Sequence, residues 1–369
     1  MNRDEFYMKQ ALGLARRGGD RVRPNPKVGA VLVKGGKVVA AGYHSRYGGP
    51  HAEARVLSRA GSRARGATLY VTLEPCSTFG KTPPCTAAIL AHGVRRVVVG
   101  AVDANPRHRG RGLNLLRRSG VEVVTGVCRE ECSLLNRDFS VWIAQERPYG
   151  MLKLALSLDG KIATKTGNSK WISSAASRRI VHRLRSSADA VMVGIGTVDA
   201  DDPSLSARMG YANPGLKKVV IDPGARLSPR ARLFARSAGV VVAVGSGAPA
   251  ARVKRLEKAG AVVVVLPGTG SELDLRMLGK YLFREKIVRL LVEGGGITAA
   301  RCLEQGLLDE VHFFFAPILV GGRGAVSSLA GTGAATIADA VSVSRLELSR
   351  PGGDIYVRGL LEPGKRRKG

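Results

Sequence analysis

Two short stretches decide the fold of the first half of this chain: Gly49-Pro50-His51-Ala52-Glu53 and Glu74-Pro75-Cys76. The first is expected to open a helix, because a run with apolar residues at helical spacing follows it. The second follows the apolar, β-branched run 68–73, so it is expected to end a strand. Cys85 comes directly after two prolines, which favour the start of another helix. A strand end beside two helix starts is typical of an α/β unit.

The same alternation of helices and strands extends outward from these stretches. Gly35-Gly36 lies between two apolar runs and is a hairpin signature. The expected elements are helices over 4–17, 51–59 and 83–91, strands over 28–33, 37–42, 68–73 and 96–102, and a further helix and strand up to about residue 127. Together they predict one sheet with helices on its faces.

The second half of the chain restarts this pattern after Arg147-Pro148-Tyr149, where a strand over 151–155 follows at once. Further apolar runs of strand length cover 190–193, 218–221, 240–244, 262–266, 288–292, 309–315 and 355–360. Most of these runs are separated by helix-length stretches, which predicts a largely parallel sheet buried on both faces. We therefore expect two α/β domains, 1–146 and 147–369, of which the second ends in a basic tail at 363–369.

The composition is that of a globular protein with a large positive charge. The 369 residues include 58 Lys and Arg against 29 Asp and Glu, a formal net charge of +29. Such a charge is typical of proteins with a nucleic-acid or anionic-surface partner. Here it is spread over both halves, and aromatic residues, which provide stacking platforms for single strands, make up only 5%. We interpret most of the charge as general surface charge and expect no nucleic-acid partner.

The sequence also indicates where the protein works. No apolar run approaches the roughly 18 residues of a membrane span, and the first residues do not resemble a signal peptide. Five scattered cysteines are too few for a disulfide framework. We expect a cytoplasmic protein with reduced thiols and no membrane partner, in which clustered cysteines serve a metal or catalysis.

His51, Cys76 and Cys85 are the residue types of a catalytic zinc site. Zinc prefers nitrogen and sulfur ligands in a tetrahedron, and a catalytic site uses three protein ligands and leaves the fourth position to water. Zinc lowers the pKa of that water to about 7. Glu53, two residues from a ligand, is placed to pass the proton of the water to a pyrimidine ring nitrogen and then to the leaving ammonia. His-Ala-Glu followed by Pro-Cys and a later Cys is the signature of zinc nucleobase deaminases.

Other interpretations of the cysteines stay open at this point. Cys76 and Cys85 could hold a structural zinc, although structural sites usually have four protein ligands. The His-Ala-Glu triplet could also be accidental. Cys128 and Cys132 stand four residues apart with no histidine near them, and we interpret them, together with Cys302, as buried thiols.

The spacing of the two cysteine ligands departs from the usual signature, which has two residues between them. Here the insert is Ser77-Thr78-Phe79-Gly80-Lys81-Thr82-Pro83-Pro84. A lysine in a Gly/Thr loop beside a metal suits a substrate phosphate, so we predict that Lys81 binds one. The insert also argues against the alternative function, a nucleic-acid or nucleoside zinc deaminase with an accessory basic domain.

The second half carries a glycine pattern, Glu293-Gly294-Gly295-Gly296, between the apolar run 288–292 and a helix expected from Ile297. Glycines let the backbone approach a ligand closely, and a helix start offers free N–H groups to a phosphate. A tight strand-to-helix turn would give the same pattern, and a Rossmann G-x-G-x-x-G is absent after the first strand. The pattern alone therefore does not decide between a nucleotide-binding site and a tight turn.

Taken together, these motifs resemble a known family. The first half is similar to the riboflavin-biosynthesis pyrimidine deaminases through the motifs at 24–29, 43–44, 49–53 and 74–85. The second half is similar to the reductase partner through 153–163, 169–173 and 196–205. Over about residues 5–360 the chain resembles the bacterial bifunctional deaminase/reductase of riboflavin synthesis.

The resemblance implies a fold and two reactions. It implies an N-terminal cytidine-deaminase-like α/β/α domain and a C-terminal dihydrofolate-reductase-like α/β domain. The first would hydrolyse an amino group from a diamino-phosphoribosylamino-pyrimidinone with one zinc ion per chain. The second would use NADPH to reduce the ribosyl group of the uracil product to ribityl. The phosphoribosylated pyrimidine would be the small-molecule partner, and the chain would form a homo-oligomer.

The family motifs also place residues around the deaminase substrate. By resemblance the substrate would contact Asn25, His44, Lys81, Asp103 and Asn105. Asp103 and Asn105 belong to an Asp-x-Asn-Pro loop, although both residue types are also common in turns after strands. Tyr47 stands where the family usually has a smaller residue, so the sequence departs from the family pattern at the edge of that pocket. His92 and His108 match no motif position, and we interpret them as surface residues.

For the reductase, the resemblance implies two residue sets. NADPH would be faced by Ala155, Trp171, Thr197, Asp201, Gly295, Gly296, Ile297 and Thr298. The substrate would be held by Ser169, Arg185, Leu205, Arg208 and Glu293. Arg185 and Arg208 suit a phosphate, because guanidinium binds phosphate with two parallel hydrogen bonds. Lys153 and Asp201 are hypothesised to assist ring opening or protonation.

Overall fold

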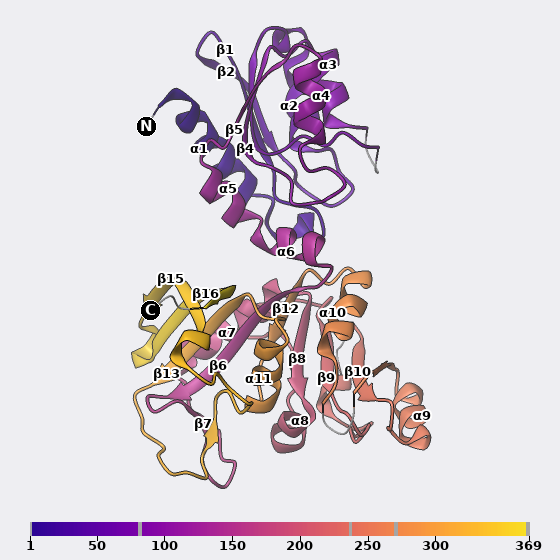
Figure 1. Ribbon diagram of the computed structural model, residues 1–369, viewed down its shortest axis with the longest axis vertical. Coiled ribbons are helices and arrows are strands. Elements are labelled where there is room, and N and C mark those ends of the chain that lie inside the picture. Colours follow the sequence, from indigo (N-terminus) through magenta and orange to yellow (C-terminus); the bar gives the residue numbers. More distant parts are fainter. Residues whose placement is uncertain (1, 80–82, 236–237, 269–271, 367–369) are drawn as a thin grey trace. The chain divides into compact units, whose positions relative to one another are not determined.

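The computed structural model describes residues 2–79, 83–235, 238–268 and 272–366 of the chain. The chain divides into two compact units, Met1–Glu146 and Arg147–Gly369, each with its own sheet (Figure 1). Among the described residues, no helix is long and apolar enough to cross a membrane.

The first unit is built on a five-stranded sheet in the order β2-β1-β3-β4-β5. The strands are β1 (Gly29–Lys34), β2 (Lys37–Tyr43), β3 (Thr68–Leu73), β4 (Arg96–Ala101) and β5 (Glu122–Thr125). β1 is antiparallel to both of its neighbours, whereas β3, β4 and β5 run parallel. The hairpin predicted at the two adjacent glycines joins β1 to β2 and is confirmed.

Helices cover both faces of this sheet (Figure 1). They are α1 (Arg3–Arg16), α2 (Ala52–Ala60), α3 (Cys85–Ala91), α4 (Arg111–Arg118) and α5 (Arg129–Leu135), and α6 (Arg137–Gln145) ends the unit. Buried side chains of α1 and α5, such as Met8 and Cys132, pack against one face. Side chains of α2, α3 and α4, such as Leu57, Ile89 and Leu116, pack against the other. The three-layer α/β/α arrangement implied by the family resemblance is confirmed.

The zinc-ligand candidates lie where this architecture brings chain segments together. β3 ends three residues before Cys76. α2 begins directly after His51, and α3 begins at Cys85. The start of α4 also lies against this loop: a Cβ on Gly112 would come within 2.1 Å of the Pro75 carbonyl oxygen. Only glycine permits that approach, so α4 can pack against the loop because Gly112 has no side chain.

The second unit is built on a nine-stranded sheet in the order β11-β10-β9-β8-β12-β6-β13-β16-β15. The strands are β6 (Tyr149–Ser157), β8 (Ala190–Gly194), β9 (Lys217–Ile221), β10 (Val240–Gly245), β11 (Ala261–Leu266), β12 (Arg289–Val292), β13 (Glu310–Ala316), β15 (Val341–Ser349) and β16 (Ile355–Arg366). Strands β11 through β13 in this order are parallel, and β16 and β15 are antiparallel additions. The largely parallel sheet predicted from the sequence is confirmed, whereas β15 was not predicted.

A second small sheet and five α-helices complete the described part of this unit. The two strands β7 (Lys161–Ala163) and β14 (Val326–Ser327) pair with each other, and the helices are α7 (Ala175–Ser187), α8 (Ile195–Asp201), α9 (Ala250–Lys258), α10 (Leu275–Arg284) and α11 (Gly296–Glu304). Leu278 and Leu282 of α10 and Ala299 of α11 pack with strand residues in one core. α8 and α11 start at the carboxyl ends of β8 and β12, the edge at which parallel sheets bind ligands.

Candidate active sites

The side chains of His51, Cys76 and Cys85 converge in the first unit. The His51 Nδ1 atom lies 3.6 Å from the Cys76 Sγ atom and 3.3 Å from the Cys85 Sγ atom. Within the described part of the chain, this is the one group of three His, Cys, Asp or Glu side chains placed to hold a metal ion, with donor atoms all within 4.8 Å of one another. One nitrogen and two sulfur donors fit zinc, and three donors rather than four fit a catalytic ion with an open position.

The local backbone explains how the two cysteines are brought together. Cys85 is the first residue of α3, and its backbone N–H donates to the Cys76 Sγ atom over 3.4 Å. The Thr86 N–H donates to the Cys76 carbonyl, which fixes the loop against the same helix start. The Cys85 N–H at this helix start favours a negatively charged Cys76 sulfur, so the fold supports a thiolate ligand at Cys76.

Glu53 lies in the first turn of α2 and is 3% exposed. Burial, reinforced by the neighbouring Cys76, raises the pKa of Glu53 to about 7. A carboxyl group with a pKa near neutral pH can both accept and release a proton. Its chemistry therefore suits proton transfer.

His44 and Asn25 lie beside the zinc-ligand group. The His44 ring stands edge-on to the His51 ring, with 5.4 Å between the centroids. The Asn25 Nδ2 atom lies 3.2 Å from His44 Nε2, and His44 Nδ1 lies 3.1 Å from the Pro50 carbonyl oxygen. These contacts assign an imidazole that donates from Nδ1 and accepts at Nε2. Burial lowers the pKa of His44, which favours this neutral form.

The loop after β4 carries Asp103 and Asn105 and is tied to the strand end before Cys76. The Asp103 side chain is almost buried and accepts a hydrogen bond of 2.9 Å from the Asn105 N–H. The Asp103 N–H in turn donates to Glu74 Oε2 over 3.2 Å. Burial raises the pKa of Asp103. Both residues make the local bonds of a turn, so the turn interpretation and the substrate interpretation are compatible.

Sequence reasoning missed the part that Glu74 plays. This residue is 4% exposed, and its carboxylate also accepts hydrogen bonds from the N–H groups of Gly110 (2.9 Å) and Gly112 (3.0 Å) at the start of α4. One carboxylate thus joins the Cys76 segment, the Asp103 loop and α4. An acidic residue directly after a buried strand was the available signal.

Three expectations for this unit have different outcomes. Lys81 lies outside the described residues. His108 is more than a free surface residue, because its Nδ1 atom lies 3.3 Å from Thr78 Oγ1 in the insert between the cysteines. Cys132 is buried as predicted, and so is Cys302 in the second unit, but Cys128 is only partly buried, because it stands at the turn before α5 with a left-handed backbone (φ 52°).

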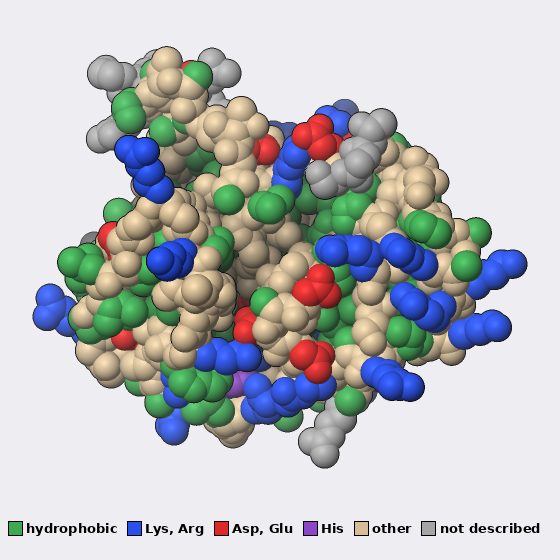
Figure 2. Space-filling model, turned by 90° about the horizontal axis from the view of Figure 1, so that it is seen from below, with side chains coloured by type: hydrophobic (Ala, Val, Ile, Leu, Met, Phe, Trp, Pro, Cys, Tyr) green, Lys and Arg blue, Asp and Glu red, His purple; other side chains and the backbone are tan. Residues whose placement is uncertain are grey.

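In the second unit one cavity of about 1640 Å³ opens at the carboxyl edge of the sheet. It is lined by residues of both predicted reductase sets and by Lys153; the list is Lys153, Ala155, Ser169, Trp171, Arg185, Thr197, Asp201, Leu205, Arg208, Glu293, Gly295, Gly296, Ile297 and Thr298. Figure 2 shows a hollow in this face of the molecule with Lys and Arg side chains around it. The volume exceeds that of most single-ligand pockets, so a dinucleotide and a substrate can share it.

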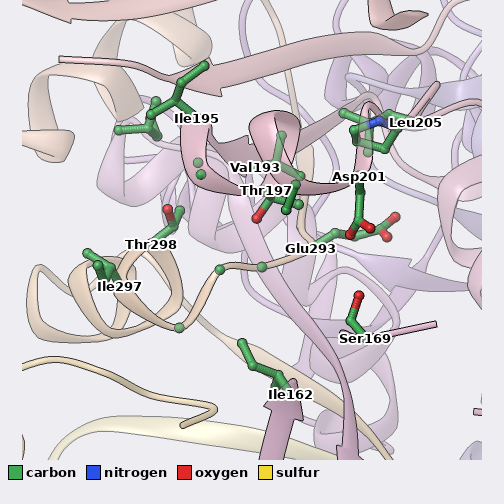
Figure 3. A pocket seen from close by; sticks show the side chains of 18 of the residues that line it. Ile162, Ser169, Val193, Ile195, Thr197, Asp201, Leu205, Glu293, Ile297 and Thr298 are labelled. Carbon is green, nitrogen blue, oxygen red and sulfur yellow. The ribbon is translucent and has the colours of Figure 1, made fainter. Parts of the chain in front are cut away.

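The glycine turn forms one wall of the cavity, next to α8. Gly295 has a left-handed backbone (φ 51°), and a Cβ on it would come within 3.2 Å of the Thr197 hydroxyl. Figure 3 shows Thr197 facing this turn, with Ile297 and Thr298 on the helix that follows. A turn that excludes side chains and a nine-residue helix that starts beside it suit the phosphates of a nucleotide, so the residues present fit NADPH.

The other end of the cavity holds buried charges. Arg185 and Glu293 form a bidentate ion pair, with Nε–Oε1 at 2.5 Å and Nη2–Oε2 at 2.8 Å. Burial opposes the ionisation of Glu293, but Arg185 outweighs it and holds the pKa of Glu293 below its ordinary value. Burial lowers the pKa of Lys153, which lies on β6 next to β12.

The contacts of Arg185 change one expectation. Besides the pair with Glu293, its Nη1 atom donates to the Ser206 carbonyl over 3.1 Å. Three of its five N–H donors are therefore used inside the protein. Arg185 is not the free phosphate clamp that its residue type indicated. Within the described part of the chain, Arg208 makes no ion pair and keeps that capacity.

Two further predicted residues lie at the cavity mouth with partners that sequence reasoning did not foresee. Lys170 Nζ lies 3.0 Å from Asp201 Oδ1, so the carboxylate is paired with a cation. The Trp171 side chain is 72% exposed, and the Arg178 guanidinium stacks over its ring at 4.6 Å. In both contacts a cationic side chain, Lys170 or Arg178, holds a predicted cofactor residue.

The comparisons with known proteins are consistent with both sites. A family model described as the RibD C-terminal domain matches residues 148–354, and one described as the cytidine and deoxycytidylate deaminase zinc-binding region matches residues 1–101. The riboflavin biosynthesis protein RibD of Aquifex aeolicus is 41% identical over 96% of this chain and 97% of that protein. The chain belongs to the RibD family.

Other RibD proteins match this chain over most of their length. The RibD protein of Escherichia coli is 39% identical over 86% of this chain and 89% of its own. The solved structure of Acinetobacter baumannii RibD (form 1) matches with a TM-score of 0.83 and 34% identity, covering 97% of this chain and 99% of the other. A Thermotoga maritima deaminase/reductase structure matches with a TM-score of 0.78 and 35% identity at the same coverage.

This membership identifies the function of the chain. It is a bifunctional enzyme of riboflavin biosynthesis, with a zinc-dependent deaminase unit and a reductase unit that uses NADPH. The nucleic-acid deaminase alternative is not favoured. RibD substrates are phosphoribosylated pyrimidines, which agrees with the expectation drawn from the sequence.

Proposed function

We propose that His51, Cys76 and Cys85 hold the zinc ion and that Glu53 moves the protons of the deamination. The observation that carries this proposal is the convergence of three donor atoms within 4.8 Å beside a buried carboxyl group. When bound, zinc supplies Lewis acidity toward the reacting water. Glu53 takes a proton from the water and gives it to the ring nitrogen of the pyrimidine. It then takes the remaining proton of the hydroxyl group added to the ring carbon and passes it to the amino group, which leaves as ammonia.

The neighbouring residues orient the pyrimidine. Asn25 and His44 form a hydrogen-bonded pair beside His51, so they are placed to bind polar edges of the ring. Asp103 and Asn105 lie on the loop fastened by Glu74 and would hold the ribosyl part. Lys81 remains the proposed phosphate ligand of the deaminase on the sequence argument alone.

In the reductase unit the cavity is divided between cofactor and substrate. The glycine turn at Gly295 and Gly296, with Thr197, would hold the NADPH phosphates, while Trp171 and Ala155 line the same space. When bound, NADPH supplies the hydride. Arg208 would bind the substrate phosphate, and the Arg185–Glu293 pair would bind the ribosyl hydroxyls through its free donors and acceptors.

Lys153 and Asp201 remain the proposed proton-handling groups of the reduction. Burial lowers the pKa of Lys153, which brings its amine closer to the range in which it exchanges protons. Opening of the ribosyl ring would leave a hydroxyl on C4′ and an imine between C1′ and the pyrimidine amino nitrogen. Hydride would add to the imine carbon, and a proton from one of these groups would complete the amine nitrogen of the ribityl product. Ser169, which lines the same cavity, would orient the ribosyl chain.

The roles of Lys153 and Asp201 are tested by single-turnover hydride transfer. We expect Lys153→Ala and Asp201→Asn to slow NADPH oxidation about 10²-fold, the lower end of general-acid effects. Lys165→Ala, an exposed lysine of the same unit, is the matched control and should leave the rate unchanged. Unchanged hydride transfer in both site variants would remove these two residues from the proposal.

Two parts of the assignment stay predictions. The first is assembly into a homo-oligomer, which sedimentation of the purified chain measures. The second is a cytoplasmic location, which fractionation of the producing cells measures. Neither affects the residue roles proposed above.

A further inference from the structure

The substrate-facing loop of the reductase unit has a strained backbone. It follows α8 and contains three non-glycine residues with left-handed φ angles: Asp202 (38°), Leu205 (52°) and Met209 (61°). Leu205 and Arg208, two proposed substrate ligands, lie on this loop and line the cavity. Such backbone angles persist only where surrounding contacts hold them.

The contacts that hold the loop come from α7. The Arg208 N–H donates to His182 Nδ1 over 3.2 Å, and the Ser206 carbonyl accepts from Arg185 Nη1 over 3.1 Å. His182 and Arg185 are three residues apart, so they project from the same face of the helix. The loop is therefore fastened at two alternate residues, one through its N–H and one through its C=O.

His182 is absent from every residue set that the sequence indicated, although it lines the cavity and is 7% exposed. Its Nδ1 atom accepts a hydrogen bond, so the ring must be neutral with its proton on Nε2. Burial, with the nearby cations Arg185 and Arg208, lowers the pKa of His182 to about 4, whereas Glu293 and the Ser206 carbonyl act in the opposite direction. The site thus keeps the acceptor form at neutral pH.

We propose that His182 is a positioning residue of the reductase, which holds the Asp202–Met209 loop in the conformation that presents Leu205 and Arg208 to the substrate. It acts through the Arg208 backbone and not on the reacting carbon. Because Arg208 is the proposed phosphate ligand, loss of this hydrogen bond should weaken substrate binding more than it slows hydride transfer. The inference rests on the proposed reductase function.

The test compares His182→Asn with His182→Gln. In Asn the side-chain oxygen is two bonds from Cβ, as Nδ1 is in His, so it can accept the same hydrogen bond. In Gln the oxygen is three bonds away, at the place of Nε2. Both variants are polar and uncharged, so they differ mainly in the position of the acceptor.

We expect His182→Gln to raise the KM for the deaminated phosphoribosyl uracil about tenfold, with kcat within about threefold of wild type, because one buried hydrogen bond is lost. His182→Asn should keep KM near the wild-type value. Calorimetric binding of the same uracil compound without NADPH should follow the KM values. Arg179→Leu, an exposed residue of α7, is the control for changes in this helix.

The outcomes separate the inference from the function on which it rests. Wild-type protein that does not reduce the uracil compound would contradict the proposed function. A working wild type with equal KM values in both His182 variants would overturn the positioning role. A fall in kcat at unchanged KM in both variants would also overturn it, since His182 would then act in the chemical step.

Discussion

Arg185 and Glu293 are joined by two parallel hydrogen bonds inside the reductase cavity, and each side chain is almost buried. The pair connects α7 to the end of β12, so it fixes the substrate end of the cavity against the glycine turn. Each charge depends on the other, because an unpaired charge at this depth would be strongly destabilising.

Substitution of Glu293 by Gln tests this dependence. We expect Glu293→Gln to lower the free energy of unfolding of the reductase unit by about 3–5 kcal/mol, because Arg185 would keep a buried charge without its counterion. Glu285→Gln removes a partner from the exposed pair with Lys217 and should cost less than about 1 kcal/mol. Calorimetric unfolding measures both. Similar small losses in the two variants would contradict the account.

Glu74 should support substrate binding by the deaminase unit, because its three backbone hydrogen bonds hold the Asp103 loop and the start of α4. In Glu74→Gln the amide N–H would face either the backbone N–H groups of Asp103 and Gly110 or that of Gly112, so the Asp103 loop and the start of α4 would lose at least one of their three hydrogen bonds. We expect the deaminase KM to rise about tenfold with zinc retained, since at least one buried hydrogen bond is lost. Glu122→Gln, at an exposed ion pair with Arg96, is the control. Loss of zinc at unchanged KM would show that Glu74 supports the metal ligands instead.

Metal removal should separate the two activities of the chain. A chelator that strips zinc is expected to abolish deamination and to leave NADPH-dependent reduction of the uracil compound intact, because the three candidate ligands all belong to the first unit. Added zinc should restore deamination, with about one ion bound per chain. Metal analysis alongside both assays measures this. Parallel loss of both activities would contradict a zinc site confined to the deaminase.

The lowered pKa of Glu310 should make the stability of the folded protein depend on pH. This carboxylate is 4% exposed and accepts from Tyr149 and Arg358, and although burial acts against it, His312 and Arg358 lower its pKa to about 2. Its pKa in the unfolded chain is near 4.5, so its stabilisation is complete above that pH and is lost as the pH falls toward 2.

The variant Glu310→Gln should therefore be less stable than wild type at pH 7, and the difference should shrink as the pH falls from about 4.5 toward 2. Unfolding temperatures of the two proteins across this range measure the effect. Glu347→Gln is the control, because that exposed carboxylate contacts the same Arg358. A difference that stays constant over the range would show that Glu310 does not titrate as described.

The sequence predicted the elements that carry strong local patterns. The β-branched runs gave the parallel strands, and the residue types at 51, 76 and 85 indicated a metal site before any geometry was available. β15 was missed because its exposed positions mix polar and apolar residues, and it pairs with β16 across register shifts.

The supporting residues could not be predicted in the same way. Glu74 and His182 act through backbone N–H groups of Gly110, Gly112 and Arg208, which are distant in sequence. Such contacts depend on the tertiary path of loops rather than on local periodicity. The ion pair between Arg185 and Glu293 could not be predicted for the same reason, because the two residues are 108 positions apart.

The central claim is that Glu53 performs the first reaction and that the second unit acts on its product. The most direct measurement is NADPH oxidation by wild type and Glu53→Gln, each supplied first with the diamino-phosphoribosylamino-pyrimidinone and then with the deaminated uracil compound. The account predicts that wild type oxidises NADPH with both compounds and that the variant, with zinc still bound, oxidises it only with the uracil compound. Oxidation of NADPH by the variant with the diamino compound at the wild-type rate would contradict it.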